Sequence, residues 1–470
     1  MIIKRFLFIL VLFSITGCST FENKPIVPDE TALNIENRSL DDPGLKTFIN
    51  QAYNRPSDQN QFDNWGLDDL TLAGFYYNPA IKVAYAQWNV ATAGKKSAAE
   101  RPNPSIGITP GNNQSNSTPT PWMAVFSTNF IIETAGKRDY RIENADQLAN
   151  AARLNVISAA WRVRQDIWNS FIDLYVSTKR QILLSDQFDI NQENLRLLKL
   201  QFDAGAISAF ELAQARIASD TTKLALLDET RAKAAALAQL AKAIGVPVKA
   251  LQKTIFTFDD LNVPAQMPIQ ELRRAALINR ADILASLAEY AASQSTLGIE
   301  IAKQYPDIGI GPGYEYDQGD NKWSLGLSFT LPLFNQNQGA IAVAEARREE
   351  AAANFNALQT QVLNEIDIAQ INFRATLNKK KSAEAMLADL IKHQQNAQKM
   401  LNAGEISYIQ LIGVRLQKNS LELSHLQAEA DLRLAYAQLE TSLQIPLEFN
   451  AAIWQGASQN SEPLITRNTP

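Results

Sequence analysis

The feature that most constrains the fold of this chain is an internal duplication. The segment PSIGITPG at residues 104–111 returns as PDIGIGPG at residues 306–313, which is 202 positions later. A second match pairs DAGAISAFELAQAR (203–216) with NAGEISYIQLIGVR (402–415), at an offset of 199. An ordered series of matches at nearly constant offset indicates two copies of one structural unit.

The duplication divides the chain into two units, residues 67–247 and 268–447, which are joined by residues 248–267. The joining segment is expected to belong to a belt around the middle of the molecule. Each unit begins with an alanine-rich segment of helical pattern, at 67–101 and at 269–304. Two short strands, a very long helix, a glycine turn and a returning helix are predicted to follow in each unit.

The long helices are predicted from the absence of helix breakers. No glycine or proline occurs between Gly136 and Gly205, or between Gly339 and Gly404. At 1.5 Å per residue each run would extend about 95–100 Å. One heptad stripe in the first run carries large apolar residues, namely Leu154, Trp161, Trp168, Tyr175 and Ile182. This stripe indicates a packing seam between helices rather than an aromatic ligand cage.

The turns after the long helices carry a shared Gly-x-Ile-Ser sequence. Gly205 and Gly404 are expected to end the helices in the left-handed conformation, and Ser208 and Ser407 to cap the returning helices. The result is two antiparallel hairpins of long helices, each with a tight tip.

The strands alternate apolar and small residues. Ile106 and Ile108 alternate with Ser, Gly and Thr, and the segment 322–332 places Trp323, Leu325, Leu327, Phe329 and Leu331 on one face. Strands of about ten residues with one apolar face are typical of outer-membrane barrels, although a half-buried sheet in a soluble protein has the same alternation. Four strands cannot close a barrel, and open edges are prohibitive in hydrocarbon. Several copies must therefore share one cylinder.

The N-terminus has the pattern of an export signal. Residues 1–17 carry Lys4 and Arg5 before a short apolar core, and the only cysteine, Cys18, follows. This pattern resembles a bacterial lipoprotein signal, which implies cleavage and acylation (for example with palmitate) at Cys18; an ordinary signal peptide with an incidental cysteine is the alternative. Because Ser19 is not an aspartate, the resemblance favours the outer membrane.

Composition argues against several classes of function. The net charge of −5 offers no basic surface for nucleic acid. The two histidines, His393 and His425, lie on predicted helices without a nucleophile motif nearby, and no phosphate-binding glycine loop occurs. We therefore expect no enzyme activity, no metal site and no cofactor.

In this order the motifs resemble the TolC-type outer-membrane efflux channels over residues 67–447. The resemblance rests on NPAI and NRADI before the alanine-rich helices, and on FIIETAGKR (130–138) and LPLFNQNQGA (331–340) before the long helices. It implies a mostly α fold with membrane β strands. The trimer would form a twelve-stranded barrel and a twelve-helix periplasmic tunnel. It also implies a passive exit duct whose partners are a periplasmic adaptor and an inner-membrane pump, for example of the RND type. FIIETAGKR and NKWSLGL look closest to members that work with heavy-metal or other resistance pumps.

The resemblance also places candidate functional residues at the tips. It implies adaptor docking at Gly205, Ile207, Ser208, Gly404, Ile406 and Ser407. Relatives carry constricting aspartates six and nine residues after the second tip glycine, but this chain has Gln410 and Gly413 there. Glu405 is the alternative source of an acidic ring, unless it is simply a solvated charge at a helix end.

The remaining segments support only coarse expectations. Residues 18–66 contain several prolines and are expected to form a lipid-anchored extended strap, and residues 448–470 a flexible C-terminal tail. The alternative to a channel is a coiled-coil structural or adaptor lipoprotein that spans the periplasm. Such a protein would not need duplicated amphipathic strand pairs.

Overall fold

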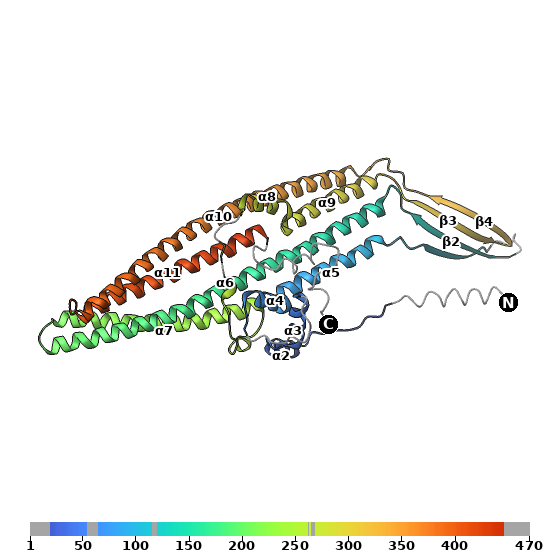
Figure 1. Cartoon of the computed structure of the whole chain (residues 1–470). Helices are drawn as coiled ribbons and strands as arrows, with labels where there is room; N and C mark the ends of the chain where they lie inside the picture. The colour runs from blue at the N-terminus through green and yellow to red at the C-terminus, as the bar shows by residue number, and fades with distance from the viewer. Residues whose placement is uncertain (1–18, 54–63, 115–119, 262, 265–267, 446–470) are drawn as a thin grey trace.

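The computed structural model describes residues 19–53, 64–114, 120–261, 263–264 and 268–445. The molecule is elongated, with a β-sheet at one end, two helical hairpin tips at the other and a cluster of short helices beside its middle (Figure 1).

Two antiparallel hairpins of long helices form most of the length. The first consists of α6 (Lys137–Asp203) and α7 (Ala209–Ile244), and the second of α10 (Gln338–Asn402) and α11 (Tyr408–Leu443). With 67 and 65 residues, α6 and α10 are each about 100 Å long. The predicted long helices and their returning partners are thus confirmed.

The hairpins lie side by side in one layer. Contacts place the helices in the order α7, α6, α11 and α10 in the half nearer the tips, so α7 and α10 form its two edges. Nearer the sheet, α5 (Pro79–Ala99) and α9 (Ala281–Ala302) take the places of α7 and α11.

The alanine-rich segments of helical pattern each fold into two helices. Each is broken once: α4 (Leu67–Tyr77) ends before Asn78, and α8 (Ile269–Asn279) ends before Arg280. Pro79 disfavours the helical conformation at Asn78, which instead caps α5 by accepting the Ala80 N–H at 2.8 Å. The residue directly after Arg280 is not a proline. The second break is instead held by the Arg280 guanidinium, which donates to the Ser442 carbonyl on α11.

The sheet contains four antiparallel strands in the order β1 (Ser105–Asn112), β2 (Trp122–Ile132), β3 (Ile308–Asp317) and β4 (Asp320–Ser328). Each unit supplies one β-hairpin, as predicted, and pairing of β2 with β3 joins the units. The fourth strand is shorter than predicted, because Phe329 and Leu331 lie beyond its end.

The segment predicted to be an extended strap contains two helices, α2 (Pro28–Glu36) and α3 (Pro43–Ala52). Pro28 and Pro43 occupy the first helical position, where the missing N–H is not needed. The prolines therefore start helices here instead of extending the chain. The packed face of α3 buries Leu45, Phe48 and Ile49 against the core.

The segment between the units packs against the middle of α6. It contains the short 3₁₀ turns η1 (Val248–Ala250) and η2 (Asp259–Leu261). Phe256 forms a parallel β-bridge with Trp65, and its ring lies 6.1 Å from that of Phe171 on α6.

The predicted heptad stripe of α6 is confirmed for its first three residues and fails at its last. Leu154, Trp161 and Trp168 are buried, but Ile182 is 61% exposed. A straight α-helix drifts by about 20° per heptad relative to a repeat of 3.5 residues per turn. The stripe has therefore rotated out of the seam by its fifth member.

Among the described helices, none has an apolar stretch long enough to cross a membrane.

Candidate functional site: the sheet and the hairpin tips

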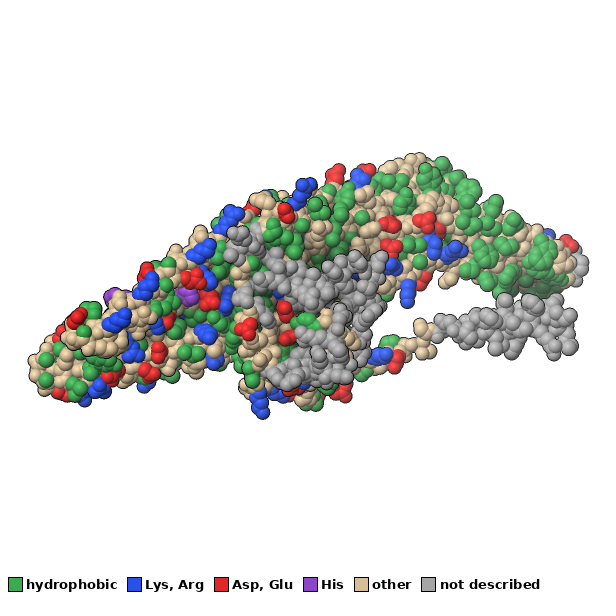
Figure 2. Space-filling view, viewed as in Figure 1, with side chains coloured by type: hydrophobic (Ala, Val, Ile, Leu, Met, Phe, Trp, Pro, Cys, Tyr) green, Lys and Arg blue, Asp and Glu red, His purple; other side chains and the backbone are tan. Residues whose placement is uncertain are grey.

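One face of the sheet is apolar and open to solvent in the single chain. The register aligns Phe126, Tyr314 and Trp323 in one row, and places Phe130, Ile310 and Leu327 in another. Trp323 is 81% exposed and Ile108 is 70% exposed. Figure 2 shows hydrophobic side chains gathered over this end of the molecule, whereas charged side chains are spread along the helices.

Aromatic side chains mark both ends of this apolar face. Trp122 and Trp323 lie beside the loops that join the strands, and the Trp323 ring packs 4.8 Å from that of Tyr314. At the helical end, Phe329 is 57% exposed and Phe334 is fully exposed. Aromatic girdles at two levels, with an apolar band between them, are characteristic of strands that cross a bilayer.

The opposite face of the sheet is built from small and polar residues. One row reads Gly107, Ser127, Gly313 and Ser324 across the four strands. A Cβ atom at Gly107 or Gly313 would lie 2.8 Å from a serine Oγ on the next strand. The absence of a side chain at Gly107 and Gly313 therefore leaves space for the serine hydroxyls on this face.

The polar face is hollowed and becomes charged toward the loops. A cleft of about 380 Å³ is lined by Ser105, Ser127, Asn129 and Ser328. Nearer the loops the same face carries Glu315, Asp317, Asp320 and Lys322, and the Lys322 ammonium lies 2.5 Å from the Asp317 carboxylate. This face can contact water and polar solutes.

The strand order leaves two edges open. Within the described part of the chain, β1 and β4 each pair with a single neighbour. Pro312 interrupts the ladder between β2 and β3, and the Thr128 hydroxyl donates to its carbonyl at 2.9 Å. The internal gap in the ladder is thus satisfied, but the outer edges of β1 and β4 are not.

A buried lysine fixes the sheet to the first long helix. The Lys137 ammonium donates to the Tyr305 carbonyl at 2.7 Å and to the Asp307 carboxylate at 2.6 Å. The Thr134 hydroxyl donates to the Pro306 carbonyl at 2.8 Å. These contacts tie the start of α6 to the start of β3, so the strands continue from the helices in a defined direction.

The hairpin tips have the predicted helix caps. Gly205 and Gly404 adopt left-handed conformations with φ of 73° and 79°. Ser208 accepts the Glu211 N–H, while the Glu211 carboxylate accepts the Ser208 N–H at 2.8 Å. The Ser208 N–H and the Ser208 hydroxyl both donate to the Glu211 carboxylate and lower the pKa of Glu211. Such reciprocal capping boxes stabilise helix starts.

The residues predicted to form a constriction lie at the second tip. Their side chains differ in whether they are engaged in hydrogen bonds within the tip. The Gln410 carboxamide oxygen accepts the Ser407 N–H at 2.8 Å and the Ser407 hydroxyl at 3.1 Å, so it serves as a helix cap. Glu405 is exposed, and a Cβ atom at Gly413 would have no neighbour within 4 Å. Ile207 and Ile406 are partly buried beside their turns. Cys18 lies outside the described residues.

Sequence reasoning missed a buried charge cluster at mid-length. The Arg164 guanidinium on α6 lies 3.2 Å from the Glu440 carboxylate on α11 and 3.5 Å from Asp68 on α4. Arg164 and Glu440 are 3% and 1% exposed, and Arg164 also lies 5.0 Å above the Trp168 ring. In the sequence, this cluster could have been predicted from an arginine that lies between the apolar stripe residues Trp161 and Trp168.

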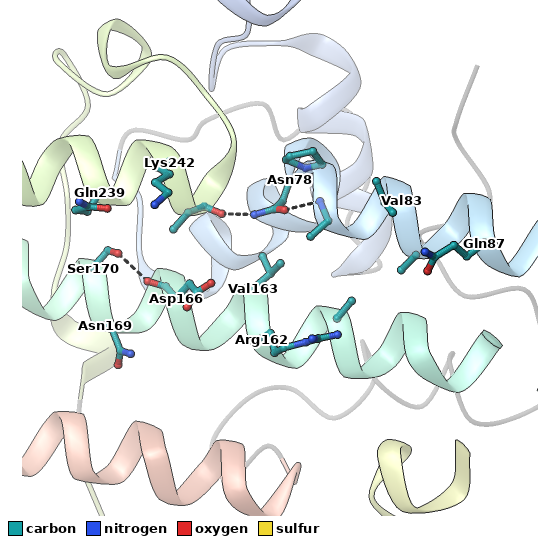
Figure 3. Close-up of a pocket in the computed structure, with 15 residues that line it drawn as sticks. Asn78, Val83, Gln87, Arg162, Val163, Asp166, Asn169, Ser170, Gln239 and Lys242 are labelled. Atoms are coloured by element: carbon teal, nitrogen blue, oxygen red, sulfur yellow. Dashed lines mark hydrogen bonds between the residues drawn. The ribbon is translucent and has the colours of Figure 1, made fainter. Parts of the chain in front are cut away.

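A groove of about 790 Å³ lies between α5, α6 and α7 (Figure 3). The Asn78 amide donates to the Ala243 carbonyl at 2.7 Å on its wall. Burial raises the pKa of Asp166, and the positive charges of Lys242 and Arg162 oppose that rise. Over the residues that the structure describes, no group of three or more His, Cys, Asp or Glu side chains could hold a metal ion.

The chain matches the model of the outer membrane efflux protein family over residues 77–246 and 272–443. It is 27% identical over 241 residues to the cobalt-zinc-cadmium resistance protein CzcC of Cupriavidus metallidurans, a match that covers 50% of this chain and 57% of CzcC. It is 26% identical over 229 residues to the pyoverdine export outer membrane protein OpmQ of Pseudomonas aeruginosa, with 46% of each chain covered. The matched part thus spans about half the length of these relatives.

The fold is that of solved outer-membrane channels. The Campylobacter jejuni CmeC outer membrane channel superposes with a TM-score of 0.67 at 16% identity, over 95% of this chain and 99% of CmeC. The long helical hairpins and the two β-hairpins in two repeats therefore form a TolC-like fold, as predicted. Because the family model matches well over half of the residues, the chain belongs to the outer membrane efflux protein family.

Proposed function

We propose that this protein is the outer-membrane exit duct of a tripartite efflux system, in which three copies form one continuous barrel and tunnel. The observation that carries the proposal is the open-edged sheet, with an apolar outer face and a polar inner face, set on helices about 100 Å long. A coiled-coil lipoprotein without a channel has no use for such a sheet.

The physical chemistry of hydrocarbon requires the association. Every backbone N–H and C=O inside a bilayer must be paired, and known barrels have at least eight strands. Three copies of a four-stranded sheet supply twelve strands, and each β4 edge then pairs with the β1 edge of the next copy.

The proposed partners are an adaptor and an inner-membrane pump, for example of the RND type, and the adaptor docks at the tips. The exposed turns around Gly205 and Gly404 are the docking elements, together with Ile207, Ser208, Ile406 and Ser407. Of the three constriction candidates, Glu405 supplies the acidic ring, because Gln410 is held by Ser407 and Gly413 has no side chain. The pump, and not the duct, selects the cargo. The names of the relatives CzcC and OpmQ favour metal ions such as cobalt, zinc and cadmium, or pyoverdine, as the cargo.

The proposed location is the outer membrane, with the helices extending into the periplasm and an acyl anchor at Cys18. Lipid surrounds the apolar sheet face, and the anchor holds the N-terminal segment at the membrane.

Conductance across a planar bilayer tests the function. Protein extracted from outer membranes with detergent should insert and produce discrete, long-lived conductance steps. Denatured protein and a variant that lacks residues 104–132 and 306–333 serve as controls. Insertion without conductance steps, or full extraction by aqueous buffer, contradicts the proposal and favours the coiled-coil alternative.

A further inference from the structure

A second groove lies where α2, α3 and α4 gather beside the start of α5 (Figure 1). This α4–α5 groove has a volume of about 760 Å³. Tyr85 and Asn89 on α5 line it, whereas Val83 and Gln87 on the same helix line the groove between α5, α6 and α7. The α4–α5 groove therefore opens on a different side of α5 from the groove of Figure 3.

Two tyrosine rings at the wall of the α4–α5 groove are braced by neighbouring rings. The Tyr76 ring lies 4.8 Å from that of Tyr77 and 5.7 Å from that of Phe48. The Tyr85 ring lies 5.5 Å from that of Trp88, edge to face. Tyr76 and Tyr85 are both partly buried. These contacts restrict the rings, so the wall offers a rigid aromatic surface.

The α4–α5 groove is also lined by three asparagine side chains, Asn34, Asn37 and Asn89. All three are exposed, and within the described part of the chain none of their amides is hydrogen-bonded. A carboxamide has two N–H donors and an acceptor oxygen. It can therefore pair with a ligand whose groups both donate and accept, such as the hydroxyl and N-acetyl groups of a sugar.

The charged side chains of the groove leave one cation without an anion. Lys82 lies at the rim, and no described residue forms an ion pair with it. Partial burial of the ammonium and the positive charge of Arg38 lower the pKa of Lys82. Asp42 also lines the groove, but its carboxylate already accepts the Gly44 N–H at 2.7 Å and the Leu45 N–H at 3.1 Å. A negatively charged ligand would stabilise the lysine cation.

The walls of the groove are held at a fixed separation. The Arg38 guanidinium donates to the Gly245 carbonyl at 2.6 Å and to the Tyr77 carbonyl at 3.3 Å. The Tyr77 hydroxyl donates to the Ser39 carbonyl at 2.9 Å. These bonds join the segment after α2 to the break between α4 and α5. The groove is thus formed before any ligand arrives, which lowers the entropic cost of binding.

We propose that the α4–α5 groove binds a saccharide chain that carries carboxylate groups. The braced tyrosine rings are large apolar surfaces with a polar edge, and they stack against the C–H faces of the sugars. The asparagine amides pair with hydroxyl and N-acetyl groups, and the Lys82 ammonium pairs with a carboxylate. Concave sites with aromatic walls and a few polar groups are the usual form of small-ligand sites.

In the proposed assembly the groove lies on the outer wall of the tunnel, within the periplasm. Its α5 residues, 81–89, precede the end of the helix at Ala99 by about 15–27 Å. An acyl anchor at Cys18, ten positions before Pro28, keeps α2 outside the tunnel. This placement rests on the proposed function and goes beyond it, because a saccharide bound there would tether the duct to a periplasmic glycan.

A lipid headgroup and a partner helix fit the groove less well. The groove is separated along α5 from the sheet that lipid surrounds. An amphipathic partner helix needs a continuous apolar groove, whereas amide and ammonium groups interrupt the aromatic wall here.

Titration with two disaccharides tests the proposal. N-acetylglucosaminyl-N-acetylmuramic acid carries a carboxylate, whereas chitobiose, which consists of two N-acetylglucosamine units, carries none. Saturation-transfer NMR would follow each sugar with the full chain in detergent. We expect saturable binding of the acidic disaccharide with a dissociation constant of about 1 mM or lower. Chitobiose should bind at least about fivefold more weakly, because it lacks the charge-assisted contact.

Variants of α5 assign the contacts. Tyr85→Ala should weaken binding of both sugars at least about fivefold, and Tyr85→Phe, which keeps the ring, should restore it to within about twofold. Lys82→Gln should weaken only the acidic sugar, by about fivefold. Lys96→Gln, at an exposed lysine further along α5, is the matched control and should change neither affinity. Unchanged affinities in both Tyr85→Ala and Lys82→Gln would place the sugar elsewhere and overturn the proposal.

Bilayer conductance of the same proteins separates this inference from the proposed function, because the groove lies outside the lumen. If the native protein conducts but neither sugar binds saturably up to about 10 mM, the groove assignment is wrong and the channel proposal stands. Equal affinity for the two sugars overturns the acidic class. Binding that appears only after removal of residues 448–470 makes the tail the occupant and overturns the proposal. Binding by a protein that does not conduct supports the groove and contradicts the channel.

Discussion

At the scale of single residues, Arg164 connects three helices that are distant in the sequence. Its guanidinium pairs with Glu440 on α11 and Asp68 on α4, and it packs on the Trp168 ring. Such a pair contributes little to stability relative to apolar residues of equal size, but the loss of one partner leaves a buried charge. The cluster therefore makes the relative position of the two hairpins specific at mid-length.

We predict that Arg164→Ala lowers the free energy of unfolding by about 3–5 kcal/mol, because Glu440 is then buried without its cation. Arg162 lies two positions away on α6 and is exposed, so Arg162→Ala should change stability by no more than about 0.5 kcal/mol. Thermal unfolding in detergent, followed by circular dichroism, compares the two. Equal melting temperatures for both variants would refute the structural role of the pair.

A second prediction at this scale concerns Glu405. Three copies of this exposed carboxylate at the proposed constriction attract cations, with about 1 kcal/mol for a contact pair in water. Glu405→Ala should therefore lower the cation-to-anion permeability ratio about two- to fivefold. Glu349→Ala, an exposed site far along α10, is the control. Reversal potentials in a salt gradient measure this permeability ratio. An unchanged ratio would contradict an acidic ring formed by Glu405.

At the scale of elements, the two units solve the same packing problem with different residues. The Asn78 amide donates to the Ala243 carbonyl at 2.7 Å, and the Arg280 guanidinium donates to the Ser442 carbonyl at 2.6 Å. Both bonds tie a helix break to the end of the returning helix. The duplicated architecture is thus retained although the side chain that holds it has changed.

The glycines of the second hairpin should respond in opposite ways to alanine. Gly404→Ala places a side chain at φ 79° and costs about 1 kcal/mol. Gly413→Ala removes a flexible residue from a helix interior with open space at the Cβ, and gains about 0.5–1 kcal/mol. Hydrogen exchange should quicken about fivefold in the last turn of α10 for the first variant and slow in early α11 for the second. The same direction of change in both would contradict this account of the tip.

The positions of glycine and proline made the helical hairpins predictable from the sequence. The helix break at Arg280 was not predictable, because tertiary contacts hold it. The runs without glycine or proline, between Gly136 and Gly205 and between Gly339 and Gly404, predicted the length of α6 and α10. The break at Arg280 depends on Glu365 and on the Ser442 carbonyl, which are distant in sequence. By contrast, the capping role of Gln410 could be predicted from the sequence, because Ser407-x-x-Gln410 has the capping-box spacing.

At the scale of the whole molecule, the described residues of the single chain expose apolar surface at several places, which include the outer sheet face, α7 (Phe210, Ile217 and Leu224) and α10 (Ile371). Contiguous exposed apolar patches mark sites that bind lipid or protein. Lipid covers the first in the proposed assembly, and neighbouring copies cover the other two.

Leu227→Glu tests the coverage of α7. In the single chain this residue is 60% exposed, so a carboxylate there should change monomer stability by no more than about 0.5 kcal/mol. In the proposed trimer the edge helix α7 meets the next copy, where this carboxylate would be buried without a partner. The native oligomer should then fall to less than about a tenth of its normal amount, which corresponds to a cost of at least about 1.4 kcal/mol. Leu33→Glu on α2, 57% exposed, is the control, and blue native electrophoresis is the measurement. Full assembly of the α7 variant would contradict the burial of α7 between copies.

Imaging of the detergent-extracted particle by electron cryomicroscopy tests the central claim most directly. We predict a hollow rod well over 100 Å long with three-fold symmetry, in which β4 of each copy pairs with β1 of the next. A single-copy particle, or a solid helical bundle without a lumen, would contradict the account.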